Sequence, residues 1–486
     1  MRRSSKSADV TTLDFSDFSG GLNLLAAPEN IDQTELCDCN NMTYASAPGR
    51  LRSRKGLGTA IHTFAANISG MYWFNCGLMI ASAGTLYRYA SGAVGEVGAL
   101  TGTAIPSWCE FGGDLFIASG GKLQKYTTAG ALSTITDSKD NTIGLYAKFG
   151  RLYCWCSNSD YKYGSASGDA STWTIPANAD ASAPLEQQIG YKVAGNIVGC
   201  IPMLSDIIVF KDDSVLRVVE ASASETTGIY EISRGEALAN KNAVTNLGGE
   251  LFYIDKSKGM RLLTGTDTYA DILPSSTLIK VNQYIRDNLT DAKCRIWHLR
   301  GRKMIVVGLG RTICIPAYYD YGIDKMPALK WTFDDEIEDI VEPDRDSLYI
   351  AVGKSFYDFT QDIDVDCYFC PKQMVGNYNY LLKRVTMHAN TYEDIPTYKA
   401  IQVLYNDIAI MSFHFGAIDS KAIYNNIESI YGNDYPLVTY VARTIEFTKH
   451  NTFRASKLKF KVTNNGGCPL EVSTFRVELV PVGVIA

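Results

Sequence analysis

Residues 111–126, FGGDLFIASGGKLQKY, contain a short apolar strand that runs into Gly120-Gly121 and a second strand that leaves toward Tyr126. Glycine adopts positive φ angles without steric cost, so this dipeptide suits a tight primed hairpin turn. Two short strands joined by such a turn predict a β-hairpin. We therefore take this hairpin as the structural unit to search for elsewhere in the chain.

The hairpin pattern recurs along the sequence. Leu78, Leu115 and Leu152 occupy equivalent positions 37 residues apart. Looser copies follow at spacings of 55, 44, 53 and 44 residues, centred on Ile207, Leu251, Met304 and Leu348. Blades of a β-propeller take about 40–50 residues each, because a single four-stranded sheet must stack on its neighbours to bury both faces. The spacing predicts a propeller of about seven blades, with six also possible, in which the leucine position marks a third strand.

The composition supports an all-β fold. The 486 residues include 29 Tyr, 19 Phe and 41 Gly, and only 20% are charged. A net charge of −6 provides no global basic field of the kind that drives non-specific nucleic-acid binding. No apolar run reaches the roughly 18 residues of a membrane span, and no apolar region follows the basic start as in a signal peptide. We expect a protein made in the cytosol, with no membrane span.

Three regions are predicted from the sequence. Residues 1–58 form a non-repeating leader with extended segments, residues 59–362 form the propeller, and residues 363–486 form a C-terminal β domain resembling a sandwich. A helical insertion is expected near 273–292, with Ser275 or Ser276 as its N-cap. C-terminal strands are expected at 398–404, 408–415, 437–447, 458–462 and 470–480.

Twelve cysteines in a chain of this length do not form a secreted disulfide framework, and several lie in apolar strands. We expect reduced thiols that pack in the core. Cys367 and Cys370 have the CxxC spacing of a zinc site, but a structural site needs a second pair that the sequence does not supply. No metal and no cofactor are predicted. The six tryptophans are expected to fill the interfaces between blades.

The sequence contains no catalytic motif, and no catalytic residues are predicted. Five histidines are scattered, and neither a His-Glu-x-x-His motif, a Gly-x-Ser-x-Gly elbow nor a phosphate-binding loop occurs. The charged residues instead gather in two places.

Acidic residues are dense between 334 and 346, where the candidate channel-lining set is Asp334, Asp335, Glu336, Glu338 and Asp339. Such a run is usually a solvated loop, and a calcium site or a negatively charged channel lining are the alternatives. Basic residues gather in the leader, where the candidate assembly or DNA contacts are Arg50, Arg52, Arg54 and Lys55. Alternation along an extended segment would point the three guanidiniums to one side, toward a partner protein or phosphates.

Two stretches of this chain resemble a known family. They are the leader residues Phe18-Ser19-Gly20-Gly21-Leu22-Asn23, Pro28, Ile31, Glu35, Asn40-Asn41, Gly49-Arg50-Leu51 and Arg54-Lys55-Gly56, and the C-terminal residues 458–466 with Leu470-Glu471-Val472. Together they are similar to the tail nozzle, or packaged-DNA-stabilising, proteins of short-tailed bacteriophages, also called tail tubular protein B. The similarity covers about a fifth of the chain.

The resemblance implies a structural virion protein without enzymatic activity. Members of that family combine a propeller with added β domains and form a hexameric ring that continues the DNA channel of the tail, retains the packaged genome and lets it exit on infection. The implied partners are further copies of the chain, the tail adaptor ring, tail fibre or spike proteins, and the passing genomic DNA. The implied location is the virion tail, assembled in the host cytoplasm. A carbohydrate-binding or carbohydrate-cleaving propeller of a phage tail is the alternative.

Overall fold

In a computed structural model, the regular secondary structure of the described residues is almost entirely β-strand. The described residues are 10–45, 49–190, 193–222, 225–265, 273–290, 292–310, 312–361, 365–392, 398–405, 407–415, 440–447, 452–465 and 470–484. By their contacts they divide into two compact units. One comprises residues 1–58, 315–332 and 361–486, and the other comprises 59–314 and 333–360. No helix in the described ranges is long and apolar enough to cross a membrane.

Within the described residues, seven four-stranded antiparallel sheets form a β-propeller. The first sheet contains β7 (Ile68–Phe74), β8 (Gly77–Ser82), β9 (Thr85–Ala90) and β10 (Ala93–Ala99). The second contains β11 (Ser107–Phe111), β12 (Asp114–Ala118), β13 (Gln124–Tyr126) and β14 (Leu132–Thr134). The third contains β15 (Thr142–Lys148), β16 (Arg151–Cys156), β17 (Tyr161–Gly164) and β18 (Leu185–Gln188). The next two are β19 (Ile197–Met203), β20 (Asp206–Lys211), β21 (Ser214–Ser222) and β22 (Glu225–Arg234), and β23 (Val244–Leu247), β24 (Glu250–Asp255), β25 (Gly259–Thr264) and β26 (Leu273–Ser276). The sixth contains β27 (Arg295–Leu299), β28 (Met304–Gly308), β29 (Ile313–Tyr318) and β30 (Trp331–Thr332).

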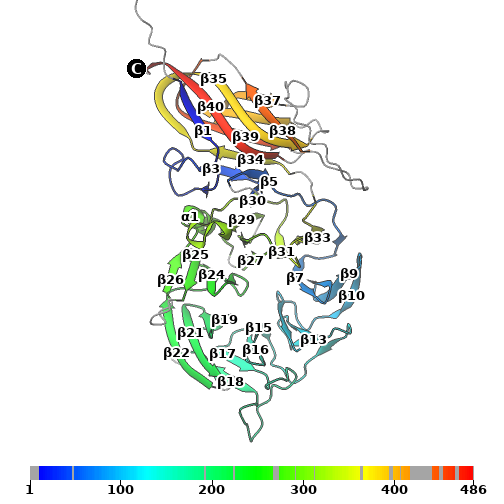
Figure 1. The fold of residues 1–486 in the computed structure, drawn as a ribbon. Helices are drawn as coiled ribbons and strands as arrows, with labels where there is room; N and C mark the ends of the chain where they lie inside the picture. The colour runs from blue at the N-terminus through cyan, green and yellow to red at the C-terminus, as the bar shows by residue number, and fades with distance from the viewer. Residues whose placement is uncertain are drawn as a thin grey trace, which may run out of the picture. The chain divides into compact units, whose positions relative to one another are not determined.

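The seventh sheet joins the two ends of the repeat region. It contains β31 (Ile337–Val341), β32 (Tyr349–Val352) and β33 (Ser355–Asp358), and its fourth strand is β6 (His62–Thr63) from the start of the region. Backbone hydrogen bonds from Ile61 N to Phe356 O (2.9 Å) and from Phe64 N to Lys354 O (2.9 Å) extend this pairing. Figure 1 shows the sheets arranged around a common centre, with the first strands β7, β15, β19, β27 and β31 nearest to it. The ring is therefore closed by hydrogen bonds rather than by packing alone.

The repeat predicted from sequence is confirmed, but its position in the blade is corrected. Leu78, Leu115 and Leu152 lie in β8, β12 and β16, which are second strands, and each is fully buried. The tight turn also lies elsewhere. Gly112 and Gly113, with φ of 61° and 86°, join β11 to β12, whereas the longer segment 119–123 connects β12 to β13.

Apolar side chains fill the spaces between neighbouring sheets. One cluster joins Phe74 and Met79 of the first sheet to Leu115 and Ile117 of the second. Similar clusters contain or contact the tryptophans 73, 108, 155 and 173, as predicted. The first strands carry β-bulges in four sheets, at Ile68/Gly70, Thr142/Gly144, Ile197/Gly199 and Ile337/Asp339. At Gly144 a Cβ would lie 2.0 Å from the Trp155 ring, so only glycine leaves room for this ring across the strand pair.

The helix differs from the prediction. Helix α1 spans Ile279–Asn288, and its N-cap Leu278 has left-handed φ and ψ without a side-chain cap. Ser275 and Ser276 belong to β26 and pair with Leu262 and Arg261 of β25, so they do not cap the helix. The serines that resembled an N-cap are instead used in a strand, because β25 offers a free edge to residues 273–276. Val281 and Ile285 provide the buried face of α1.

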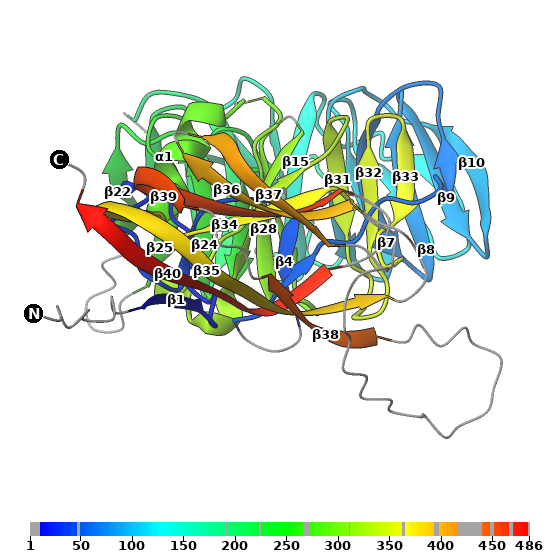
Figure 2. The ribbon, with the colours of Figure 1, turned by 90° about the horizontal axis from the view of Figure 1, so that it is seen from above.

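The first unit is built from strands at both ends of the chain. Twelve strands form one hydrogen-bonded sheet system: β1 (Thr11–Phe15), β2 (Gly21–Leu22), β3 (Glu35–Asn40), β4 (Met42–Tyr44), β5 (Leu51–Ser53), β34 (Cys367–Pro371), β35 (Met374–Tyr392), β36 (Tyr398–Tyr405), β37 (Ile408–Phe415), β38 (Tyr440–Phe447), β39 (Thr452–Asn465) and β40 (Leu470–Val484). Within it, β1 and β5 pair with β40, and β3 pairs with β34. Figure 2 shows β1 running beside β40. The leader is thus an integral part of the sheet formed by the C-terminal region.

Strand β39 links two parts of this sheet system. Its residues 452–458 pair with β35, whereas residues 459–465 pair with β36. Strands that change partners in this way form the corners of packed sheets. Phe460 and Phe475 are fully buried, with ring centroids 6.0 Å apart. Both residues belong to the core of the first unit.

Candidate functional site

The candidate site is a network of charged groups on the first strands of the propeller and the connections that precede them. In a four-stranded meander, the connection to the next sheet lies at the same end as the turn between the second and third strands, because each antiparallel strand reverses direction. We call this end of the propeller the connection face. Lys241 lies in the β22–β23 connection, α1 in the β26–β27 connection, and Asp334 to Glu336 in the β30–β31 connection. All of them therefore belong to the connection face.

Lys241 ties together three sheets. Its ammonium donates hydrogen bonds to the carbonyl oxygens of Ile105, which precedes β11, and of Ile143 in β15. The next residue, Asn242, accepts a backbone hydrogen bond from Ile296 in β27 (3.0 Å). Burial, and after it the Arg295 guanidinium, lower the pKa of Lys241 to about 7. The hydrogen bonds to the carbonyl oxygens of Ile105 and Ile143 oppose this lowering of the pKa, because they stabilise the charged ammonium.

Asp339 is the second centre of the network. Its Oδ2 accepts a hydrogen bond from Met71 N in β7 (2.6 Å), and its Oδ1 accepts one from Trp297 Nε1 in β27 (2.7 Å). Arg295 Nη1 lies 3.4 Å from Asp339 Oδ2, and Arg295 Nη2 donates to Ser69 O (3.0 Å). Burial raises the pKa of Asp339, while Arg295 opposes that shift. One carboxylate thus joins the first strands of three sheets.

The structure separates the acidic residues that were predicted as one set. Asp334 and Asp335 are exposed. Glu336 forms an ion pair with Lys293, and Glu338 accepts a hydrogen bond from Asn67 Nδ2 (2.9 Å). Asp339 is buried, and both of its carboxylate oxygens accept hydrogen bonds within the propeller. It is therefore no longer a candidate for a channel lining. The β-bulge between Ile337 and Asp339 breaks the alternation of β31, so that Asp339 pairs with Ala351 and is buried, whereas Glu338 stays partly exposed.

The basic residues of the leader also separate. Arg50 is half-exposed, with Nη1 3.8 Å from Glu471 Oε1. Arg54 is buried and donates to Asn41 Oδ1 (2.9 Å), Lys55 O (2.7 Å) and Thr332 O (2.7 Å). Arg54 is therefore a structural residue of the first unit, and the predicted row of three guanidiniums on one side is wrong. Arg52 and Lys55 are partly buried.

Sequence reasoning missed Lys241 and Arg295. Lys241 lies in a polar loop without any distinguishing pattern. Arg295 did carry a signal, because it is a charged residue that opens the apolar strand Arg295–Leu299. A charge at such a position needs a buried partner.

Metal-ligating residues do not cluster in the described ranges, where no group of three or more His, Cys, Asp or Glu side chains could hold an ion. Cys367 and Cys370 are both buried in β34. Cys76, expected in the core, is exposed in the turn between β7 and β8.

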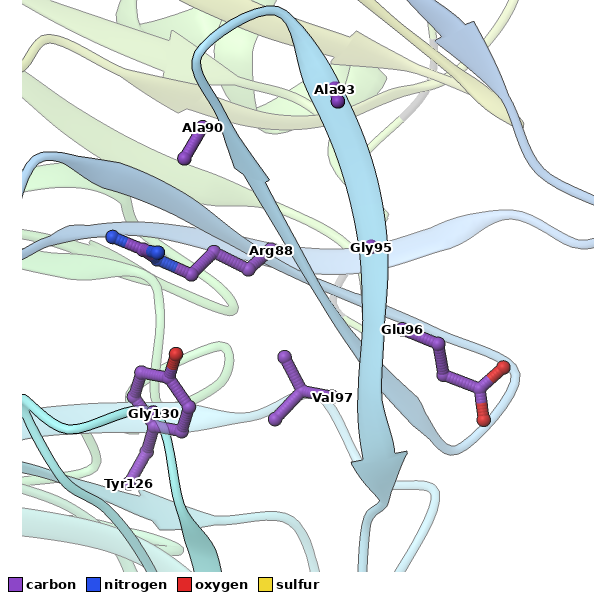
Figure 3. Close-up of a pocket in the computed structure, with 8 residues that line it drawn as sticks. All are labelled: Arg88, Ala90, Ala93, Gly95, Glu96, Val97, Tyr126 and Gly130. Atoms are coloured by element: carbon purple, nitrogen blue, oxygen red, sulfur yellow. The ribbon is translucent and has the colours of Figure 1, made fainter.

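A shallow surface depression lies on the first two sheets. Figure 3 shows its lining residues, which are Arg88, Ala90, Ala93, Gly95, Glu96, Val97, Tyr126 and Gly130. Arg88 Nη2 donates to Asn75 O (2.9 Å), which holds its guanidinium against the β7–β8 turn. Glu96 points away from Arg88 and Tyr126 in this view (Figure 3). The polar groups do not converge on one point, so the depression provides no chemistry comparable to the network on the connection face.

Comparison with known proteins identifies no family for this chain. No protein-family model and no curated protein matches the sequence. Among solved structures, the chain is similar to YCF48 bound to a D1 peptide, with 10% identity, a TM-score of 0.41, and coverage of 67% of this chain and 99% of that one. It is also similar to the extracellular domain of a one-component system from B. thetaiotaomicron (10% identity, TM-score 0.44, 81% and 60% coverage) and to BBS1N in complex with ARL6DN (10%, 0.40, 63% and 95%). The assignment as a propeller rests on the seven four-stranded sheets themselves.

Proposed function

We propose that this chain is a structural virion protein of a short-tailed phage, which assembles into the tail nozzle ring and does no covalent chemistry. The observation that carries the proposal concerns the two stretches that resemble nozzle proteins. Although they are more than 400 residues apart, they form one paired element. Leu51 and Arg52 pair with Val472 and Glu471, and Leu470 N donates to Ser53 Oγ (3.1 Å).

The other leader residues of the resemblance have structural roles in the same unit. Asn23 Nδ2 and Asp32 N both donate to Glu35 Oε2, at 2.8 Å and 2.7 Å. Phe18 is fully buried, and its ring packs edge-on against Phe369 with centroids 5.4 Å apart. The resemblance therefore rests on residues that together build one β unit, as expected of a shared fold rather than of isolated matches.

The proposed partners follow from the nozzle role. They are further copies of this chain, six in the proposed ring, the tail adaptor ring, fibre or spike proteins, and the genomic DNA that passes through the channel. Negative-stain imaging of the purified protein and of virions tests the ring directly. Six-fold rings at the tail tip are expected. Monomers that bind or hydrolyse host polysaccharide would instead support a carbohydrate-directed propeller.

We further propose that exposed acids of the connection face line the channel and repel DNA phosphates, so that the genome slides without binding. Asp334 and Asp335 are the members of the predicted set that are exposed. The double variant Asp334→Lys/Asp335→Lys should assemble normally but eject DNA more slowly, and the delay should shrink as salt is raised. The matched control is Glu96→Lys/Asp346→Lys, which changes the same charge at two other exposed positions. Equal ejection rates for both double variants would refute the lining.

A further inference from the structure

Two cysteines from opposite ends of the chain meet inside the first unit. Strands β3 and β34 are antiparallel, with Leu36 opposite Pro371 and Asp38 opposite Cys370. Cys37 is the extra residue of a β-bulge between these pairs, so its side chain is not committed to the alternation of the strand. Cys37 and Cys370 pack in one small cluster with Ile31. We propose that Cys37 and Cys370 are a redox-reactive dithiol that forms a disulfide on exposure to hydroperoxides.

The surroundings distinguish the roles of the two thiols. Cys37 Sγ donates a hydrogen bond to Pro371 O (3.2 Å), and Cys370 donates one to the Cys37 sulfur. The hydrogen bond from Cys370, assisted by the Lys459 ammonium, lowers the pKa of Cys37 although burial opposes it. The same hydrogen bond and burial raise the pKa of Cys370. Cys37 is 7% exposed and Cys370 1%, so Cys37 is the thiol that a small oxidant meets first.

The chemistry balances with one hydroperoxide per disulfide. The Cys37 thiolate attacks one oxygen of hydrogen peroxide, the O–O bond breaks, and Cys37 becomes a sulfenic acid while hydroxide leaves and takes up a proton. The Cys370 sulfur then attacks the Cys37 sulfur, and the sulfenic oxygen leaves as water with the Cys370 proton. Two thiols are oxidised by two electrons in total, and one peroxide is reduced to two waters. The lower pKa favours Cys37 as the first nucleophile.

Other buried cysteines provide an internal comparison. Burial raises the pKa of Cys39 to about 12, although it lies only two residues from Cys37. Cys154 and Cys156 are also buried, and burial raises the pKa of each thiol. A neutral thiol reacts poorly with peroxide. Selective oxidation of the Cys37/Cys370 pair is therefore expected. The disulfide would link residues that are 333 positions apart in the sequence. Its formation does not depend on the function proposed above.

The test uses the chain with Cys76→Ser, which removes the thiol that is exposed among the described cysteines. After peroxide treatment and alkylation, non-reducing digestion and mass spectrometry should find a Cys37–Cys370 crosslinked peptide, with a loss of two titratable thiols per chain. The melting temperature of the oxidised protein should rise by roughly 5 to 15 °C, because the crosslink restricts the unfolded chain. Adding Cys370→Ser should abolish both effects, whereas adding Cys154→Ser should preserve them. Recovery of Cys37 and Cys370 as alkylated thiols, or a disulfide between Cys37 and Cys39, would overturn the proposal.

Discussion

Replacement of Lys241 by methionine should change how the stability of the propeller depends on pH. The pKa of Lys241 is lowered from 10.5 to about 7 in the folded state. Between these two values the unfolded chain binds a proton that the folded chain does not, so the free energy of unfolding of the wild type rises with pH. Below pH 7 both states are protonated, and this contribution no longer changes.

The expected magnitude follows from the two pKa values. Each pH unit contributes up to about 1.4 kcal/mol, so the wild type should gain about 2 to 3 kcal/mol relative to Lys241→Met between pH 7.5 and 9.5. The variant also leaves the carbonyl oxygens of Ile105 and Ile143 without their donor, at a cost of about 1 to 3 kcal/mol each. That cost is independent of pH. It lowers the free energy of unfolding of the variant by the same amount at every pH, so the slope of that free energy against pH is unchanged.

Urea unfolding followed by tryptophan fluorescence at several pH values measures both effects. Comparison of wild type with Lys241→Met cancels the contributions of other titrating groups. Lys256→Met, which alters an exposed lysine, should run parallel to the wild type. If Lys241→Met is also parallel to the wild type between pH 7.5 and 9.5, Lys241 keeps its ordinary pKa and the reasoning is refuted.

Two further substitutions test buried charges. Asp339→Asn removes the buried partner of Arg295 and should lower the free energy of unfolding in urea by about 3 to 5 kcal/mol. Asp335→Asn, at an exposed position, should change that free energy by no more than about 0.5 kcal/mol. Similar changes for both variants would contradict the network. Arg151, which is fully buried, donates to four carbonyl oxygens in the segment 165–183, so Arg151→Met should release that segment to limited proteolysis. Arg234→Met, which alters an exposed arginine, is its control, and equal cleavage of both variants would argue against this role.

Much of the architecture could be predicted because its signals are local. Glycine turns, alternating apolar residues and the 37-residue spacing each act within one hairpin, where the side-chain period of two decides which face is buried. The C-terminal strands at 398–405 and 408–415 were found for the same reason. The 19 residues of β35 were missed, since Gly376-Asn377 near its start is typical of a turn and the strand lacks a clean alternation to mark it.

The site was less predictable, because it depends on contacts between distant segments. The acidic run was recognised as a feature, but the burial of Asp339 depends on partners in β7 and β27. Arg54 likewise belonged to a basic cluster in the sequence and became buried through Asn41 and Thr332. Composition reveals a charge, and only the surrounding fold reveals whether water or another side chain surrounds it.

A β-propeller of repeated hairpins, with a leader of extended segments and a C-terminal β domain, could be predicted from local patterns, because each hairpin is specified by its own turns and alternation. Which strand edges meet depends on the folded structure. It closes the ring with β6 on β33, pairs the leader with β40 and β34, and brings Cys37 against Cys370. Such pairings join residues hundreds of positions apart. They depend on which backbone edges remain unpaired after every hairpin has formed, and no local pattern records that outcome.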